Sequence, residues 1–264
     1  MPWELDDSEP RITPDGALSY YGRLLGGPEA LALPDLLVAT FQQQALQHMV
    51  DRLGAAPPTR WPTTVFWPLT RASLDGRTLA LARIPIGAPA AASALELAIA
   101  AGVRTVLVVG SAGSLQPHLP VGSLAIPTAA LRHEGTSHHY LPAGEPAVAT
   151  STLVDRLLST ALRRGVPAPA VGPVWTTDAI YRECAETVER HRAAGVLAVE
   201  MEAAALFAVA SHRGAQVALI AAISDELWGS WKPGFHTLAY RRALLTAADI
   251  ALETAAGIPI PFSA

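Results

Sequence analysis

From residue 35 onward, short apolar runs alternate with amphipathic segments. Runs that are apolar at every position predict strands buried on both faces, and apolar residues spaced three and four apart predict helices. This alternation predicts an α/β fold, a single domain with a central mixed, largely parallel sheet flanked by helices. The expected strands are 35–41, 104–110, 123–133, 168–177, 196–200 and 216–224, and the expected helices are 45–54, 94–102, 202–214 and 237–256.

Glycine and proline mark the ends of several elements. Asp75 and Gly76 separate two β-like runs within residues 64–86 and predict a hairpin with a type I′ turn. Prolines and glycines crowd the first thirty residues. We therefore expect residues 1–30 to be an irregular N-terminal arm or a few short elements, which could cross onto a neighbouring subunit, and residues 31–264 to form the main domain.

Composition narrows the class of protein. The 264 residues are 50% hydrophobic and 16% charged, which is enough apolar material for one large core. A formal charge of −4 with no basic stripe argues against nucleic acid or a membrane surface as a partner. One cysteine, Cys184, excludes an internal disulfide framework, and the N-terminus does not resemble a signal peptide. We expect a cytoplasmic protein.

Four expected strands end in polar residues. In α/β sheets ligands bind at the carboxyl ends of the strands, so these ends are candidate binding segments. They read GSAGS (110–114), TTDAIYRE (176–183), VEME (199–202) and ISDEL (223–227).

The first two segments each allow two interpretations. Residues 110–114 form either a tight turn or a backbone nest in which Ser111, Ala112 and Gly113 bind an anion or a sugar oxygen. Residues 176–183 either contain a helix cap at Thr177 or Asp178, followed by a solvated Arg182 and Glu183 pair, or present Tyr181 as a flat face for a ring.

The carboxylates of the other two segments also leave alternatives open. Glu200 and Glu202 can share one face only if the following helix begins at or after Met201, and they could then bind neighbouring sugar hydroxyls. Otherwise Glu202 stabilises the helix N-terminus and Glu200 faces solvent. Asp225 is either part of a helix cap with Ser224 or a general acid whose pKa is raised by apolar neighbours.

Two other kinds of site lack their sequence patterns. The histidine-rich segment 133–139 does not have HExxH spacing, so we expect no metal site. Ser111 has no sequence context that supports a catalytic triad, and GSAGS matches neither a phosphate-binding loop nor a dinucleotide fingerprint.

Together these segments resemble the nucleoside phosphorylase/nucleosidase superfamily, which includes uridine phosphorylase, hexameric purine nucleoside phosphorylase and methylthioadenosine nucleosidase. The resemblance covers roughly residues 70–256, with the segments in the family's order and spacing. It implies an enzyme that cleaves the N-glycosidic bond of a nucleoside or nucleoside analogue, without metal or redox cofactor. It also implies a homo-oligomer.

The resemblance also assigns roles to individual residues. Asp225 matches the acid that protonates the base, and Ser111 matches a hydroxyl near attacking phosphate. Residues 200–202 match the segment with which the family binds ribose. In this segment Glu202 binds the ribose hydroxyls and Met201 packs under the sugar, beside Glu200. The base is expected against Ile180, Tyr181 and Arg182.

The chain departs from the family pattern where phosphate binds. Val108 occupies the position of a phosphate-binding arginine, and the loop after the first strand lacks the family's Gly-Asp-Pro and arginine. Phosphate needs charged donors, so we expect water as the acceptor. The alternative is a phosphate-dependent phosphorylase giving ribose 1-phosphate, in which Arg71, Arg83, Arg132 or a neighbouring subunit's arginine takes over.

Two further questions stay open: which base the protein prefers and whether it is catalytic. Cys184 and Glu186 stand where uridine phosphorylases place their pyrimidine-reading Gln and Arg, and Asp225 favours a purine. A non-catalytic nucleoside-binding module is a third possibility, although a binder has no need of the acid at Asp225.

Overall fold

The computed structural model describes residues 5, 6, 8–61 and 68–259. Residues 1–4 and 7 of the expected arm and residues 64–67 of the expected hairpin segment lie outside this part of the chain. The described strands are β1 (Leu36–Thr40), β2 (Thr59–Arg60), β3 (Pro68–Leu74), β4 (Arg77–Arg83), β5 (Thr105–Ser114), β6 (Leu124–His133), β7 (Ala147–Val148), β8 (Ala170–Thr177), β9 (Ala198–Glu200), β10 (Gln216–Glu226) and β11 (Lys232–Pro233).

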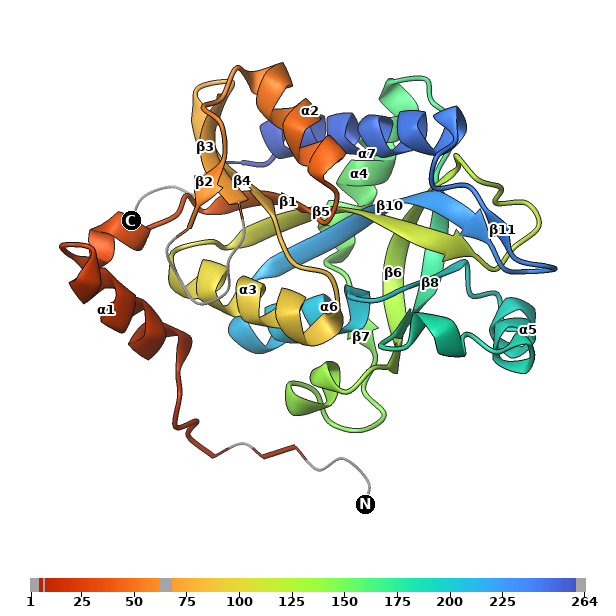
Figure 1. The fold of residues 1–264 in the computed structure, drawn as a ribbon, viewed down its shortest axis with the longest axis horizontal. Helices are drawn as coiled ribbons and strands as arrows, with labels where there is room; N and C mark the ends of the chain where they lie inside the picture. Colours follow the sequence, from red (N-terminus) through yellow and green to blue (C-terminus); the bar gives the residue numbers. More distant parts are fainter. Residues whose placement is uncertain (1–4, 7, 62–67, 260–264) are drawn as a thin grey trace.

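These strands form one mixed sheet, which confirms the predicted α/β fold (Figure 1). The central strands β4, β1, β5 and β10 pair in parallel in that order. Antiparallel pairs join β3 to β4, β6 to β10 and β9 to β5. Because β6 also pairs with β8 and β8 with β9, the strands β5, β10, β6, β8 and β9 form a closed circuit of pairings.

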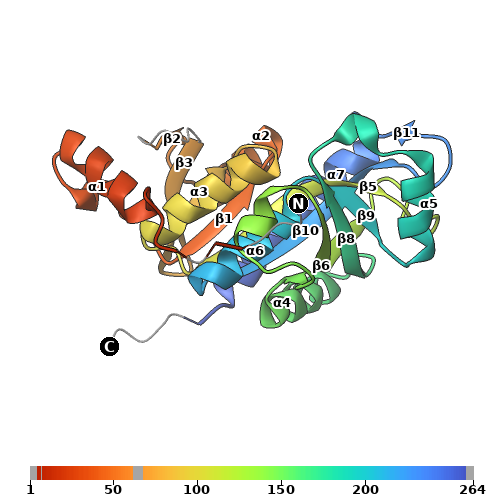
Figure 2. The same cartoon turned by 90° about the horizontal axis from the view of Figure 1, so that it is seen from below.

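Helices cover both faces of the sheet (Figures 1 and 2). The helices α3 and α6 pack together on one face, while α2, α4 and α7 pack together on the other. Within the described residues, no helix combines the length and apolar character that a bilayer crossing requires. The helices are α1 (Pro14–Leu24), α2 (Gln43–Leu53), α3 (Ala88–Ala100), α4 (Ser151–Arg163), α5 (Ala185–Ala193), α6 (Ala203–Arg213) and α7 (Leu238–Ala256), with 3-10 turns η1 (Pro28–Leu31), η2 (Thr136–His139) and η3 (Ile180–Arg182).

Local sequence signals explain where several elements begin and end. Asp75 and Gly76 have φ of 49° and 80°, as a type I′ turn requires, and β3 and β4 pair across it. Gly54 has φ 57° and ends α2 in the left-handed conformation that glycine adopts readily. At the start of α7 the Thr237 hydroxyl accepts the Tyr240 N–H as a cap. The expected hairpin and both of these helices are therefore confirmed.

Three elements run longer than the sequence pattern indicates. α3 begins at Ala88, six residues before the expected start, because Pro89 fits the first turn of a helix. β5 continues to Ser114 and β10 to Glu226, so two of the four candidate binding segments lie inside the sheet.

The expected N-terminal arm is not irregular throughout. Pro14 begins α1, and the Thr13 hydroxyl accepts the Gly16 N–H as its cap. α1 contacts α3 and projects from one end of the molecule (Figures 1 and 2).

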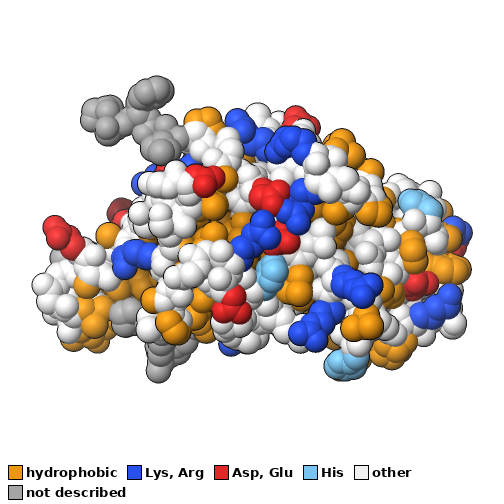
Figure 3. Space-filling view, turned by 90° about the horizontal axis from the view of Figure 1, so that it is seen from above, with side chains coloured by type: hydrophobic (Ala, Val, Ile, Leu, Met, Phe, Trp, Pro, Cys, Tyr) orange, Lys and Arg blue, Asp and Glu red, His pale blue; other side chains and the backbone are white. Residues whose placement is uncertain are grey.

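Ion pairs join α2, α4 and α7 on the outer face, where acidic and basic side chains lie side by side (Figure 3). Asp249 on α7 lies 2.7 Å from the His48 ring, 3.0 Å from Arg52 and 3.0 Å from Arg164. Glu253, one helical turn further along α7, contacts the same two arginines. The three helices are thus linked by charge as well as by apolar packing.

Candidate active site

A cavity of about 160 Å³ lies at the carboxyl ends of β5 and β10. It adjoins a larger cavity of about 740 Å³, and Tyr181 lines the larger one. Arg182 is exposed and lines neither. The structure thus brings most of the sequence-predicted site residues together in the smaller cavity: Ser111, Ala112, Gly113, Ile180, Glu200, Met201, Glu202 and Asp225.

The segment 110–114 is not a tight turn, so that interpretation is wrong, and binding of an anion or a sugar oxygen by Ser111, Ala112 and Gly113 stays a prediction. It is the extended end of β5, in which Gly113 pairs with Asp225 of β10 and Val199 of β9. A Cβ at Gly113 would lie 2.4 Å from Leu227 Cδ1 and 3.3 Å from both carboxylate oxygens of Asp225. A side chain here would force Leu227 to shift and would press against the Asp225 carboxylate, so glycine keeps both residues in place.

Glu200 caps helix α6 from the preceding strand. Its carboxylate accepts the N–H groups of Glu202 and Ala203 at 2.8 and 2.6 Å and a hydrogen bond from the Thr176 hydroxyl. The helix begins at Ala203, as convergence of the two carboxylates requires. The alternative with Glu200 in solvent is wrong, because Glu200 is only 6% exposed and itself satisfies the helix N-terminus.

Glu202 is buried to the same extent and lines the same cavity as Glu200. Its Oε1 accepts the Gly87 N–H at 2.6 Å, which ties it to the start of α3. Burial raises the pKa of Glu202, and the nearby charge of Glu200 raises it further. Burial likewise raises the pKa of Glu200. A buried carboxylate in a cavity is suited to accept hydrogen bonds from a ligand.

Asp225 lies near the end of β10, after a bulge between Ile223 and Asp225. The Ser224 hydroxyl donates to Oδ1 and the Trp231 indole N–H donates to Oδ2, each at 2.8 Å. Asp225 is within a strand, so the helix-cap interpretation is wrong. It lines both cavities, and its two hydrogen bonds fix the orientation of the carboxylate.

Neutral polar groups surround Ser111. The Gln42 amide donates to the Ser111 hydroxyl at 2.9 Å, and the Tyr240 hydroxyl lies 2.6 Å from it. Burial raises the pKa of Tyr240, which keeps the phenol neutral. The sequence reasoning missed Gln42 and Tyr240, although Gln42 follows directly after a buried strand, as the candidate segments do.

The arginines considered as phosphate ligands do not line the smaller cavity. Val108 is buried within β5. The Arg71 side chain donates to the carbonyl of Ala32. Arg132 donates to carbonyls of the loop that follows η2. Arg83 is the last residue of β4.

Residues 176–183 do not form the expected helix cap and solvated pair, while Tyr181 lines the larger cavity and its role as a face for a ring stays a prediction. Thr177 accepts the Ala179 N–H at 3.3 Å, and Asp178 accepts the Gly135 N–H at 3.0 Å, so neither caps a regular helix. Glu183 lines both cavities and forms no pair with Arg182 among the described residues. Burial, together with the charge of Asp225, raises the pKa of Glu183 to about 7. The expected solvated pair is wrong.

Comparisons with known proteins show the family to which the chain belongs. The family model described as "Phosphorylase superfamily" matches residues 37–256. Guanosine phosphorylase from Halorubrum lacusprofundi is 36% identical over 159 residues, which are 60% of this chain and 66% of that protein. Uridine phosphorylase from Haemophilus influenzae is 30% identical over 164 residues, 57% of this chain and 65% of that protein. The chain thus spans just under two thirds of these curated relatives.

A solved structure shares the fold over a greater length. The uridine phosphorylase from Vibrio fischeri ES114 superimposes with a TM-score of 0.77 and 25% sequence identity. The match covers 87% of this chain and 94% of that one.

Proposed function

Because the chain belongs to the phosphorylase superfamily, we propose that it cleaves the N-glycosidic bond of a nucleoside and transfers the pentosyl group to an acceptor. The observation that carries this proposal is the position of Glu202 and Asp225, two buried carboxylates from different elements that line one cavity. One can bind the sugar while the other acts on the leaving base.

Glu202 is the proposed ligand of the ribose hydroxyls. A carboxylate accepts hydrogen bonds from two neighbouring hydroxyls, and these bonds are charge-assisted. Met201 supplies an apolar wall to the same cavity. Glu200 acts indirectly, because it holds the first turn of α6 and thereby the backbone that carries Glu202.

Asp225 is the proposed acid for the base. As the bond between the sugar and the base breaks, its electron pair moves to the base, and protonation by Asp225 neutralises the developing charge. Ser224 and Trp231 hold the carboxylate in place. We propose a purine-type base, supported by Asp225 and by the similarity to a guanosine phosphorylase, while the uridine phosphorylases support a pyrimidine.

Phosphate is the acceptor that the comparisons favour, since the relatives are named phosphorylases. The water acceptor that the sequence favoured has less support from them. In this proposal phosphate enters beside Ser111, whose hydroxyl, together with the Gln42 amide and the Tyr240 hydroxyl, supplies hydrogen-bond donors.

Water is a second candidate, and one observation favours it. The polar groups around Ser111 are neutral, and the three arginines considered above do not line the cavity. A bound phosphate dianion would therefore lose its hydration without a cation from these residues to offset the cost.

An assay with purine and pyrimidine nucleosides, in phosphate-free buffer and with millimolar phosphate, tests the proposal. Strict phosphate dependence with ribose 1-phosphate as product supports the phosphorylase. Release of free ribose without added phosphate supports the second candidate. Asp225→Asn should abolish turnover, whereas the matched variant Asp178→Asn, outside both cavities, should not. Absence of free base under every condition would contradict glycosidic cleavage.

We also propose that the protein is a homo-oligomer in the cytoplasm. Support comes from the projecting arm, where Ile12 and Leu24 are 86% and 67% exposed. Sedimentation should give a mass well above the 27.7 kDa of one chain. A monomer at micromolar concentration would contradict the oligomer.

A further inference from the structure

The smaller cavity is too small for a whole nucleoside. At about 160 Å³ it falls below the range of about 300–1,000 Å³ that is usual for small-molecule sites. The adjoining cavity of about 740 Å³ lies within that range. The two cavities share four lining residues, Ile180, Glu183, Asp225 and Phe235. A ligand whose sugar contacts Glu202 would therefore extend past Asp225 into the larger cavity.

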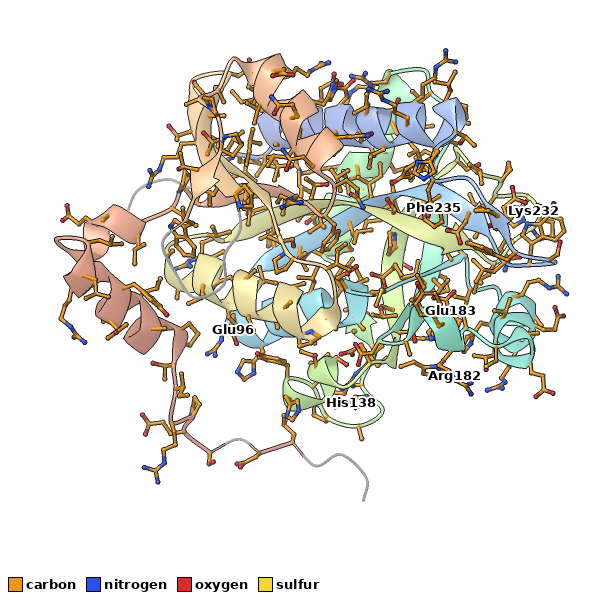
Figure 4. All side chains as sticks on the ribbon, in the orientation of Figure 1. Glu96, His138, Arg182, Glu183, Lys232 and Phe235 are labelled. Atoms are coloured by element: carbon orange, nitrogen blue, oxygen red, sulfur yellow. The ribbon has the colours of Figure 1, made fainter. Side chains whose placement is uncertain are left out.

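The walls of the larger cavity are rich in aromatic rings. Trp228, Trp231, Phe235 and Tyr181 line it, and Trp231 and Tyr181 are 62% and 97% exposed. The Lys232 ammonium lies 4.6 Å from the centre of the Trp228 ring. Figure 4 shows Lys232, Phe235 and Glu183 at the same end of the molecule. Exposed rings around a hollow are suited to bind an apolar or aromatic group.

One carboxylate in this cavity lacks a partner. Glu183 is half-buried, and within the described part of the chain it accepts no hydrogen bond and forms no ion pair. Asp225, by contrast, already accepts from Ser224 and Trp231. A half-buried carboxylate that no protein group satisfies is available to accept a hydrogen bond from a ligand.

We propose that the larger cavity binds an apolar or aromatic substituent on the base, attached through an N–H that donates to Glu183. The substrate class is then a purine-type nucleoside with a bulky group on its exocyclic amine. This inference rests on the proposed function, because it takes the sugar to lie at Glu202 and the base beyond Asp225.

Adenosine and N6-benzyladenosine are suitable probes, since they differ only in the substituent. We expect kcat/KM for N6-benzyladenosine to exceed that for adenosine by at least about tenfold, the range seen when a group fills an apolar pocket. Equal or lower kcat/KM for N6-benzyladenosine would overturn the inference.

A cavity-filling variant locates the effect. Ala185 is exposed at the start of α5 and lines only the larger cavity. Ala185→Phe should therefore lower the preference for N6-benzyladenosine about tenfold. The kcat/KM for adenosine should stay within about twofold of the wild-type value. Arg190→Phe places the same ring on an exposed position of the same helix outside both cavities and should leave the preference unchanged. An unchanged preference in Ala185→Phe would also overturn the inference. If the sedimentation mass of Ala185→Phe also differs from that of the wild type, a second copy of the chain occupies this surface instead.

Binding of the free bases separates this inference from the proposed function. Quenching of tryptophan fluorescence should show tighter binding of 6-benzylaminopurine than of adenine, and Ala185→Phe should remove the difference. If no nucleoside is cleaved but this difference is found, the proposed function fails and the cavity assignment stands. If adenosine is cleaved and the difference is absent, the assignment fails and the function stands.

Discussion

Glu200 and Glu202 are two residues apart and equally buried, yet different groups satisfy them. Two backbone N–H groups of the α6 start and a threonine hydroxyl surround Glu200. Both line the cavity, but fewer protein groups donate to Glu202, among them the Gly87 N–H, so it keeps capacity to accept hydrogen bonds from a ligand. Substitution of each should therefore affect a different property.

Glu202→Gln should weaken transition-state binding by about 2–4 kcal/mol, because the charge-assisted bonds to the ribose are lost. The melting temperature should change little, since the oxygen of the Gln amide can still accept the Gly87 N–H. Steady-state kinetics and thermal melting check this. Near-wild-type turnover would remove Glu202 from the ribose site.

Glu200→Gln should instead lower the free energy of unfolding by about 1–3 kcal/mol. Both N–H groups at the start of α6 bond to one carboxylate oxygen, so the amide nitrogen takes the place of the other oxygen, and the buried Thr176 hydroxyl loses its acceptor. Denaturant unfolding measures the change. A variant with full stability and no activity would show that Glu200 touches the substrate directly.

Glu183 makes stability depend on pH. Its folded-state pKa of about 7 is above the ordinary 4.5, so the folded state binds more protons between these values. The stability from the protonated form is complete below pH 4.5 and is lost as the pH rises through 7. When the pH rises from 5 to 8, the free energy of unfolding of Glu183→Gln should therefore increase by about 1 kcal/mol relative to that of the wild type. This figure is reduced for solvent screening of the half-buried group.

Unfolding at both pH values measures this gain. Glu186→Gln, an exposed carboxylate on α5, is the matched control and should show no such gain. A pH-independent difference between Glu183→Gln and wild type would contradict the assignment.

The sequence predicted which residues gather at the site better than it predicted their partners. Glu202 and Asp225 were found because charged residues in apolar runs are conspicuous, and Met201 because it lies between two of them. Gln42 was missed because a neutral amide after a strand has no such contrast, and Tyr240 because it lies 129 positions from Ser111. Contacts over such distances depend on packing, which local patterns do not encode.

At the scale of elements, hydrophobic periodicity placed the central strands and the helices α2, α3, α6 and α7, missed α1, α4 and α5, and misjudged several ends. The periodicity of β5 and β10 stops where glycine, serine and aspartate begin, although both strands continue. Pairing with neighbouring strands, rather than residue preference, determines where they end.

The ion pairs between α2, α4 and α7 should contribute to the packing of these helices. Asp249 is 14% exposed and contacts a histidine and two arginines, so Asp249→Ala should lower the free energy of unfolding by about 1–3 kcal/mol. Glu189→Ala removes an exposed pair within α5 and should change the free energy of unfolding far less. Equal changes in thermal unfolding would show that Asp249 contributes no more than a surface pair.

At the scale of the whole molecule, the α/β architecture follows from the alternation of apolar runs, and the resemblance to a family follows from the order of four short segments. The closed pairing of β5, β10, β6, β8 and β9 does not follow from either. It depends on β9, a strand of three residues whose two partners are β5 and β8.

That closed circuit limits local opening of the sheet. A strand with a neighbour on each side cannot peel away from an edge, so its amides exchange with deuterium only when a large part of the sheet opens. The backbones that carry Ser111, Glu200 and Asp225 lie in such strands. Entry of a ligand must therefore depend on segments outside the circuit, around Tyr181 and Trp231, which should exchange orders of magnitude faster than the strands beneath them.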